Sequence, residues 1–300
     1  MKCSYCGKKA VVNLRYAGKK FCEKHFIDFY ERKVRRVIKK NNMFSRKEKI
    51  GVGVSGGKDS LVMLYLLKKM HYDVTAIAID EGIKGYRDKT LPYVKKLCAE
   101  LDVPLHLYSF KQEYGMTLDQ IHSKKKTLAC SYCGVLRRSL LNKAARELRC
   151  DKLAIGHNLD DEVQMIIMNL TRSELLRLAR SGPVVGLVKH GKFVPRAKPL
   201  RECSEKEDVI YALLKGIEYS EAECPYAHEA FRSTVREAIN LMEEKHPGVK
   251  IGILRSFDRM LPFLRKYFSK TSASELNECV ECGELTSGKL CKACELMKNL

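Results

Sequence analysis

Short, continuous apolar runs alternate with longer stretches of helical spacing through the middle of the chain. The first run, KIGVGV at 49–54, precedes a helical pattern at 58–70. Runs of this length without polar alternation predict strands that are buried on both faces. Three further pairs of strand and helix follow, at 73–79 with 87–102, 104–110 with 133–149, and 151–158 with 159–170. This alternation predicts an α/β fold with an open parallel sheet, whose ligands lie at the carboxyl ends of the strands.

The segments on either side of this alternating region show other patterns. Residues 26–44 predict a connecting helix with a basic outer face, and from about 198 to 270 only helical patterns remain. We therefore expect four parts. These are an N-terminal zinc module at 1–30, a linker helix at 31–47, a catalytic domain at 48–270 with a helical last part (about 198–270), and a C-terminal zinc module at 271–300.

The charge balance narrows the class of partner. Lys and Arg total 56 against 36 Asp and Glu, which gives a formal net charge of +20. Such an excess predicts attraction to a polyanion, nucleic acid first, and a solvated basic surface without a partner is the alternative. Because no apolar stretch approaches membrane-spanning length and the first residues lack a signal-peptide pattern, we expect a cytoplasmic protein that does not enter the membrane. Few glutamines beside many charged residues favour a heat-adapted source.

The chain carries 13 cysteines, and seven of them, together with one histidine, lie in two quartets near the ends of the chain. A reducing compartment favours thiols or metal ligands over disulfides. Cys3, Cys6, Cys22 and His25 form two ligand pairs, and Cys279, Cys282, Cys291 and Cys294 form another two. Paired ligands on tight turns are what a tetrahedral zinc site needs, so we predict one Zn²⁺ in each quartet. Four protein ligands leave no open position, which predicts a structural role.

A third C-x-x-C pair, Cys130 and Cys133, has no second pair close by in sequence, and Cys224 stands alone before a proline. Three cysteines suit an iron–sulfur cluster with one open iron. A redox dithiol at Cys130 and Cys133, or a zinc site completed by another group, are equal alternatives from the residues alone. Cys98 and Cys150 fall in helical patterns and are expected to be buried packing thiols.

The segment SGGKDS, Ser55 to Ser60, joins the first predicted strand to the first helix. Its backbone N–H groups would therefore lie at the positive end of a helix, where they bind anionic oxygens. Gly56 and Gly57 let the backbone approach a phosphate closely, while Lys58 adds a positive charge. The spacing differs from a Walker loop and suits a loop that holds pyrophosphate as a leaving group. A glycine turn that merely starts a helix is the plainer alternative.

The segment GVSGGKDS resembles the PP-loop signature of the ATP pyrophosphatases. Together with Cys130, Cys133, Cys224, the segment GHNLDDEVQ and zinc modules at both ends, it resembles the TtuA-type tRNA 2-thiouridine synthetases. This resemblance covers the whole chain. It implies that ATP adenylates the C2 carbonyl oxygen of a tRNA uridine, that pyrophosphate leaves into the loop, and that sulfur then displaces AMP.

The resemblance also implies a set of site residues. Cys130, Cys133 and Cys224 would hold a 4Fe–4S cluster, and Asp161 and Lys58 would join them in catalysis. Asp161 would lie near the phosphates as a Mg²⁺ ligand or would orient the uridine, although Asp160 and Asp161 also suit helix capping. Arg137 or Arg138 would reach the α-phosphate, unless they form a solvated basic face. The implied ATP-binding residues are Gly53, Ser55, Gly56, Gly57, Lys58, Asp59, Ser60, Ile79, Asp80, Arg137, Gly156 and Asp161.

The expected partners are tRNA, a ubiquitin-like sulfur carrier with a C-terminal thiocarboxylate, and a second copy of the chain in a homodimer. The T-loop uridine at position 54 is the first predicted target, and the wobble uridine at position 34 is the alternative. Two rival classes remain. An adenylating ligase would need an amine donor but no extra cysteines, and a zinc-bearing RNA-binding adaptor would explain the charge but not SGGKDS.

Overall fold

The computed structural model describes residues 1–124, 129–185, 192–226, 230–271 and 277–300. Its centre is a six-stranded sheet in the order β5-β4-β3-β6-β8-β7. All neighbouring strands are parallel except β7, which pairs antiparallel with β8 at one edge. The strands are β3 (Lys49–Gly53), β4 (Asp73–Asp80), β5 (Leu105–Ser109), β6 (Lys152–Ala154), β7 (Val184–Val185) and β8 (Arg196–Ala197).

The predicted parallel sheet is confirmed, and the structure adds two strands to it. The four apolar runs become β3 to β6, and their helices are α2 (Lys58–Lys69), α3 (Arg87–Glu100), α6 (Ala129–Glu147) and α7 (Leu159–Thr171). Strands β7 and β8 have two residues each, which is too short to produce a periodic pattern. The short helices α4 (Phe110–Tyr114), α5 (Leu118–Lys124) and α8 (Leu175–Ala179) complete this region.

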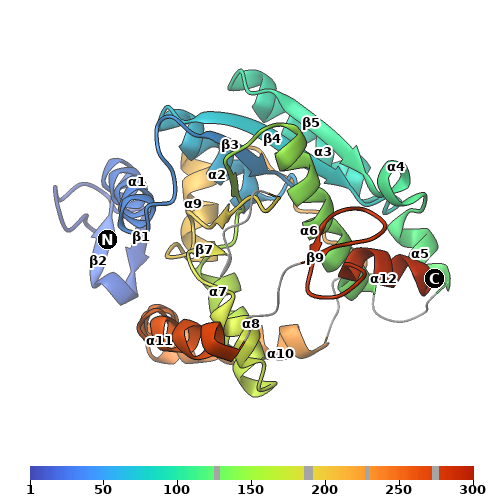
Figure 1. Cartoon of the computed structure of the whole chain (residues 1–300). Coiled ribbons are helices and arrows are strands. Elements are labelled where there is room, and N and C mark those ends of the chain that lie inside the picture. The colour runs from blue at the N-terminus through green and yellow to red at the C-terminus, as the bar shows by residue number, and fades with distance from the viewer. Residues whose placement is uncertain (125–128, 186–191, 227–229, 272–276) are drawn as a thin grey trace.

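The helix that follows the N-terminal module belongs to the main hydrophobic core. This helix, α1 (Glu23–Lys40), buries Phe26, Tyr30, Val34 and Val37 completely. It packs against α9 (Glu205–Lys215), which in turn packs against α2. Figure 1 shows α1 beside the small hairpin of β1 (Val12–Leu14) and β2 (Lys19–Phe21). Its exposed face carries basic residues as expected. Its buried face is part of the main core, so α1 is a core helix and not only a connection between two parts of the chain.

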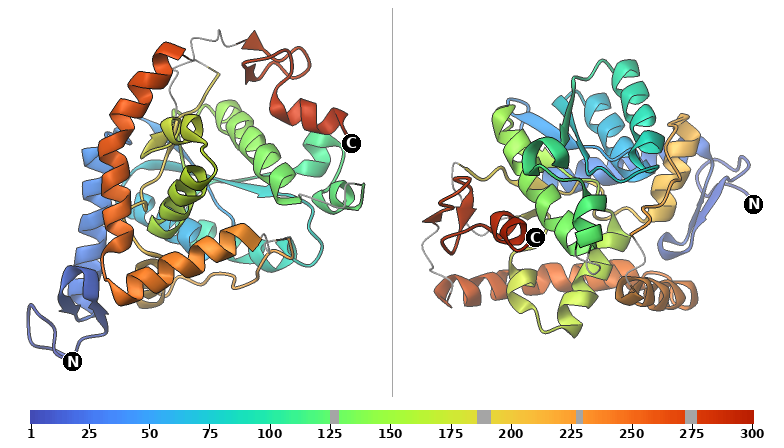
Figure 2. Two further views of the ribbon diagram at one scale, coloured as in Figure 1. Left: turned by 90° about the horizontal axis from the view of Figure 1, so that it is seen from below. Right: turned by 90° about the vertical axis from the view of Figure 1, so that its right-hand side faces the viewer.

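The last helices form a separate layer. Helices α10 (Ala230–Lys245) and α11 (Val249–Thr271) pack against α7 and α8. Val163, Leu178, Ile239 and Phe257 are buried in the apolar cluster that joins these four helices. Figure 2 shows α11 as a long helix, and Figure 1 shows it below the sheet, beside α8. Among the described residues from 198 to 271, the structure has three helices and no strand.

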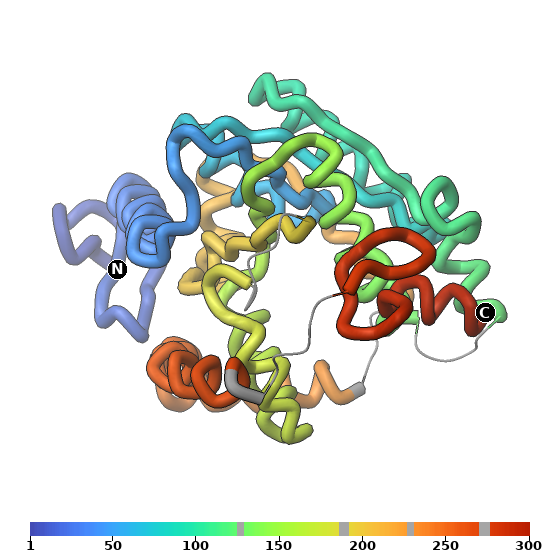
Figure 3. Tube along the Cα trace, viewed as in Figure 1, coloured from blue at the N-terminus to red at the C-terminus, as the bar shows by residue number. Residues whose placement is uncertain are grey.

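The C-terminal module consists of β9 (Asn277–Glu278), β10 (Leu285–Thr286) and α12 (Lys292–Lys298), and α12 packs on α6. The two ends of the chain lie on opposite sides of the molecule (Figure 3). Among the described residues, no helix combines the length and the apolar character that crossing a membrane requires.

Candidate active site and metal centres

The phosphate loop follows β3 at the carboxyl end of the sheet, as expected. The Ser60 hydroxyl organises it, because Ser60 Oγ accepts from the Ser55 N–H at 3.1 Å and donates to the Gly57 carbonyl at 2.9 Å. Gly56 adopts φ +88°, and a Cβ there would meet the Thr90 carbonyl oxygen at 2.3 Å. Only glycine fits this position. The N-terminus of α2 has no side-chain cap, so its first N–H groups remain available to an anion.

Lys58 and Asp59 connect the loop to α9. Lys58 Nζ lies 2.7 Å from Glu205 Oε1 and 3.5 Å from Asp59 Oδ2. Burial raises the pKa of Asp59, and burial together with Asp59 raises the pKa of Asp208 well above its usual range. Tyr30 of α1 donates to Asp208 Oδ1 at 2.5 Å. Burial and the neighbouring Asp59 carboxylate therefore both favour the protonated form of Asp208.

Other predicted nucleotide ligands surround the same edge. A Cβ on Gly156 would lie 3.0 Å from the Ser60 backbone nitrogen, so the segment after β6 presses against the loop. Asp80 ends β4 and accepts from the Gly82 N–H at 2.8 Å, and Ile79 beside it is buried. Gly53 ends β3 directly before the loop. The structure therefore brings these residues together as one site.

The two carboxylates at the start of α7 differ in their surroundings. Asp160 is buried, pairs with Lys250 of α11 and accepts from the Glu205 backbone N–H, so it joins helices. Asp161 forms a capping box with Asn158, and its Oδ1 lies 2.9 Å from Arg232 Nη2. The capping reading is thus confirmed for Asp161, while its predicted role near the phosphates stays a prediction.

The cysteines of the third motif lie at the start of α6. Because α6 runs back across the sheet between β5 and β6, its first turns lie at the carboxyl edge that carries the phosphate loop. The Cys130 thiol donates to the Tyr226 carbonyl at 2.8 Å, which joins α6 to the segment that carries Cys224. Cys133 is buried beside Arg137, whose Nη2 donates to its Sγ at 3.0 Å. Burial raises the pKa of Cys133, with Cys224 contributing.

These sulfurs do not crowd together as the terminal quartets do. Among the described residues, only the two quartets bring three or more ligand atoms within 4.8 Å of one another. A cluster of several irons is wider than one zinc ion and holds its ligand sulfurs farther apart. Cys130, Cys133 and Cys224 therefore lack the close convergence of ligand atoms that a single zinc ion needs.

Glu81 is a site residue that the sequence reasoning missed. It directly follows β4, is completely buried and pairs with Arg87 and Arg137. Its Oε1 lies 2.6 Å from Arg137 Nε. Arg137 is therefore engaged by Glu81 and Cys133. Arg138 has no hydrogen bond or ion pair with the part of the chain that the structure describes, and its predicted reach to the α-phosphate stays a prediction. An acidic residue directly after a buried strand was the signal that could have revealed Glu81.

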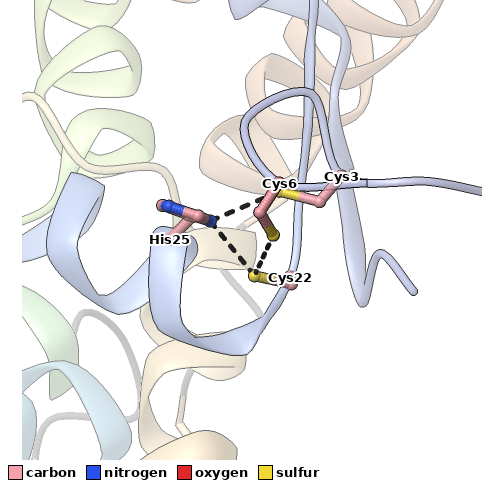
Figure 4. Close-up of side chains that lie close together, drawn as sticks. All are labelled: Cys3, Cys6, Cys22 and His25. Atoms are coloured by element: carbon pink, nitrogen blue, oxygen red, sulfur yellow. Dashed lines mark hydrogen bonds between the residues drawn. The ribbon is translucent and has the colours of Figure 1, made fainter. Parts of the chain in front are cut away.

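Both terminal quartets converge as zinc sites require. Figure 4 shows Cys3, Cys6, Cys22 and His25 facing one another. Cys6 Sγ lies 3.7 Å from Cys22 Sγ, and His25 Nδ1 lies 3.5 Å from Cys3 Sγ and 3.3 Å from Cys22 Sγ. In the C-terminal quartet, Cys282 Sγ lies 3.5 Å from Cys291 Sγ. Tetrahedral ligands at about 2.3 Å from zinc would be about 3.8 Å apart, so both sets fit that ion.

A phosphate loop of this spacing after the first strand of a parallel sheet defines a PP-loop protein. The family described as PP-loop domain matches residues 28–243, and that described as the N-terminal LIM domain of the 2-thiouridine synthetase TtuA matches residues 2–27. The tRNA 2-thiolation protein NcsA of Haloferax volcanii is 36% identical over 318 residues, covering 100% of this chain and 99% of that protein. The chain therefore belongs to the PP-loop family of tRNA sulfurtransferases.

Two further relatives differ in the tRNA position that their names give. The tRNA-5-methyluridine(54) 2-sulfurtransferase of Pyrococcus horikoshii is 37% identical over 295 residues, covering 98% of this chain and 93% of that protein. The structure of the U34-tRNA thiolase NcsA from Methanococcus maripaludis, solved with its 4Fe–4S cluster, superposes with a TM-score of 0.85. It is 36% identical, and the match covers 100% of this chain and 96% of that one.

Proposed function

We propose that this chain replaces the C2 oxygen of a tRNA uridine with sulfur at the expense of ATP. One observation carries the proposal: the phosphate loop and the three-cysteine site lie at the same edge of the sheet, joined through Glu81. A uracil carbonyl is a poor electrophile, and its adenylation creates a leaving group. Both halves of the chemistry therefore need to meet at one base.

In the first half of the reaction, the C2 oxygen attacks the α-phosphorus of ATP and pyrophosphate leaves. The N–H groups at the start of α2 and the Lys58 ammonium would hold the departing oxygens. Lys58 is paired with Glu205 in this structure, so phosphate would compete for it. We propose Asp161 and Asp59 as the neighbouring carboxylates that would hold Mg²⁺, and the ion would supply positive charge to offset that of the phosphates.

In the second half, sulfur attacks C2 and AMP leaves. We propose Cys130, Cys133 and Cys224 as ligands of a 4Fe–4S cluster, like the one in the Methanococcus maripaludis structure. When bound, such a cluster supplies an open iron that can hold the incoming sulfide. The chain's own groups orient this site, because Arg137 donates to Cys133 and the Tyr226 carbonyl holds Cys130.

The proposal has two candidates for the tRNA position of the thiolated uridine. The terminal modules suggested the T-loop uridine, and we retain position 54 as the first candidate, with the Pyrococcus horikoshii relative in support. The wobble uridine is the second candidate, and a full-length match to a U34-tRNA thiolase favours it. Since that match spans both modules, the modules alone do not separate the two positions. The sulfur carrier, the homodimer and the cytoplasmic location stay predictions.

Anaerobic thiolation tests this proposal. The zinc-loaded and cluster-loaded protein is incubated with ATP, Mg²⁺, sulfide and an unmodified tRNA transcript, and thionucleosides are mapped by mass spectrometry. We expect 2-thiouridine at one position with wild type and none with Cys130→Ala. Cys98→Ala, which removes a buried thiol outside the site, is the matched control and should retain activity. Thiolation by Cys130→Ala, or none by wild type with either sulfide or a thiocarboxylated carrier, would overturn the proposal.

A further inference from the structure

We propose that Glu81 is a positioning residue that holds the phosphate loop and the cysteine site in one fixed geometry, so that ATP binding is sensed at the sulfur site. The inference rests on the proposed function and deepens it. Glu81 comes directly after β4, between the phosphate loop of β3 and the N-terminal turns of α6. Its side chain is 0% exposed, so both carboxylate oxygens depend on protein partners.

One side of the link runs to the nucleotide. Arg87 binds Glu81 through two parallel contacts, Nε to Oε2 at 2.5 Å and Nη2 to Oε1 at 2.7 Å. Arg87 Nη1 then donates to the Ser55 carbonyl at 2.9 Å. A bidentate pair fixes the plane of the guanidinium, and the third nitrogen therefore fixes the start of the phosphate loop. Arg87 Nη1 also lies 3.3 Å from Thr90 Oγ1, and Thr90 contacts Gly56.

The other side runs to the sulfur site. Glu81 Oε1 lies 2.6 Å from Arg137 Nε, and Arg137 Nη2 donates to Cys133 Sγ at 3.0 Å. One carboxylate thus fixes two guanidiniums, one against the loop and one against a proposed cluster ligand. Groups that contact a metal ligand in this way orient it and tune its electronic properties.

The electrostatics hold the carboxylate charged. Burial alone would raise the pKa of Glu81, but Arg137 and Arg87 together lower it below its usual range. Both oxygens of the charged Glu81 carboxylate therefore face guanidinium groups, Oε2 that of Arg87 and Oε1 those of Arg87 and Arg137.

A buried ion pair can also serve only the stability of the fold, so the test must separate stability from positioning. Glu81→Gln keeps the size and removes the charge. Glu31→Gln is the matched control, because Glu31 is also a buried acid with two cationic partners, Lys69 and Arg35. Both variants are prepared with zinc and cluster, and ATP affinity, iron content, thermal unfolding and the electron paramagnetic resonance spectrum of the reduced cluster are measured.

We expect ATP to change the spectrum of the wild-type cluster and of Glu31→Gln. Glu81→Gln should bind ATP about tenfold more weakly, should lose iron faster, and should show no spectral response to saturating ATP. The same spectral response in Glu81→Gln as in wild type would overturn the inference. A wild type without any response would overturn it as well, as would an equal loss in Glu31→Gln.

Two further variants keep the test decisive if Glu81→Gln does not fold. Arg87→Lys cuts the branch to Ser55 and should weaken ATP binding at normal iron content. Arg137→Lys cuts the branch to Cys133 and should lower iron retention at normal ATP affinity. Both should lose the spectral response, and its persistence in both would overturn the inference. Wild-type thiolation, measured on the same preparation, reports on the proposed function separately.

Discussion

The two terminal modules share their ligand chemistry but attach to different halves of the site. In both, a cysteine begins a helix: Cys22 precedes α1, and Cys291 precedes α12. The N-terminal module continues into the main core, where Phe21, Phe26 and Tyr30 are completely buried. Through Tyr30 and Asp208 it reaches Asp59 of the phosphate loop.

The C-terminal module contacts the sulfur half instead. Glu284 pairs with Arg146 of α6 at 2.5 Å and accepts from Asn142 Nδ2 at 3.1 Å. Its Cys279, Cys291 and Ala293 are buried with residues of α6, the helix that carries Cys130 and Cys133. The comparison teaches that two similar quartets of potential metal ligands support different parts of the site, the N-terminal one the phosphate loop and the C-terminal one the helix of Cys130 and Cys133.

Removing an N-terminal zinc ligand should have the largest effect. Structural zinc contributes on the order of 10 kcal/mol to the folding of small modules, and α1 passes that loss to the core. We expect Cys22→Ala to lose one zinc, to unfold at a much lower temperature and to bind ATP weakly. Calorimetry, metal analysis and ATP titration measure these effects. An unchanged unfolding temperature in a protein that has lost this zinc would contradict the inference that α1 couples the N-terminal module to the core.

Removing a C-terminal ligand should produce the complementary pattern. Cys291→Ala should lose the other zinc and retain iron poorly, because α6 loses the packing of α12. Its ATP affinity should stay within about twofold of wild type, since this module touches no phosphate-loop residue among those described. Equal effects of Cys22→Ala and Cys291→Ala on ATP affinity would break the comparison.

A pH-dependent effect tests the contact between α1 and the phosphate loop. Asp208 has a raised pKa, so the folded chain holds a proton that the unfolded chain releases. The stability tied to that proton is complete at acidic pH and is lost as the pH rises toward the folded pKa. The side chain of Asp208→Asn stays neutral at every pH. The melting temperature of this variant relative to wild type should therefore rise from pH 5.5 to 8.5. A constant difference across this range would contradict the assignment.

The smallest effect should come from the partly exposed pair that joins the C-terminal module to α6. Arg146→Met removes the contact to Glu284 and should lower the free energy of unfolding by about 1 kcal/mol or less. Iron content should fall slightly while zinc stays bound. Chemical denaturation with metal analysis measures both, and Lys298→Met, which removes a more exposed pair within the module, is the control.

The sequence predicted what depends on local pattern. Strands β3 and β4 are continuous apolar runs, and the spacing of paired ligands identified both quartets that converge in the structure. The sequence could not predict contacts between distant segments, such as Lys58 with Glu205 across 147 residues. Glu81 has no neighbouring motif, and only the fold brings Arg87 and Arg137 to it. Strand β8 was not predicted because its two residues are too few to show a hydrophobic pattern.

The packing of α1 also has a consequence for synthesis on the ribosome. Tyr30 and Glu31 find their partners Asp208 and Tyr211 only 178 and 180 residues later in the chain. Zinc binding could fold the N-terminal module early in synthesis. The apolar face of α1 would still be exposed to solvent until α9 has been synthesised. Contacts of such long separation form late and leave apolar surface open to aggregation. We therefore expect the nascent chain to need a chaperone that binds the apolar face of α1 until α9 is available.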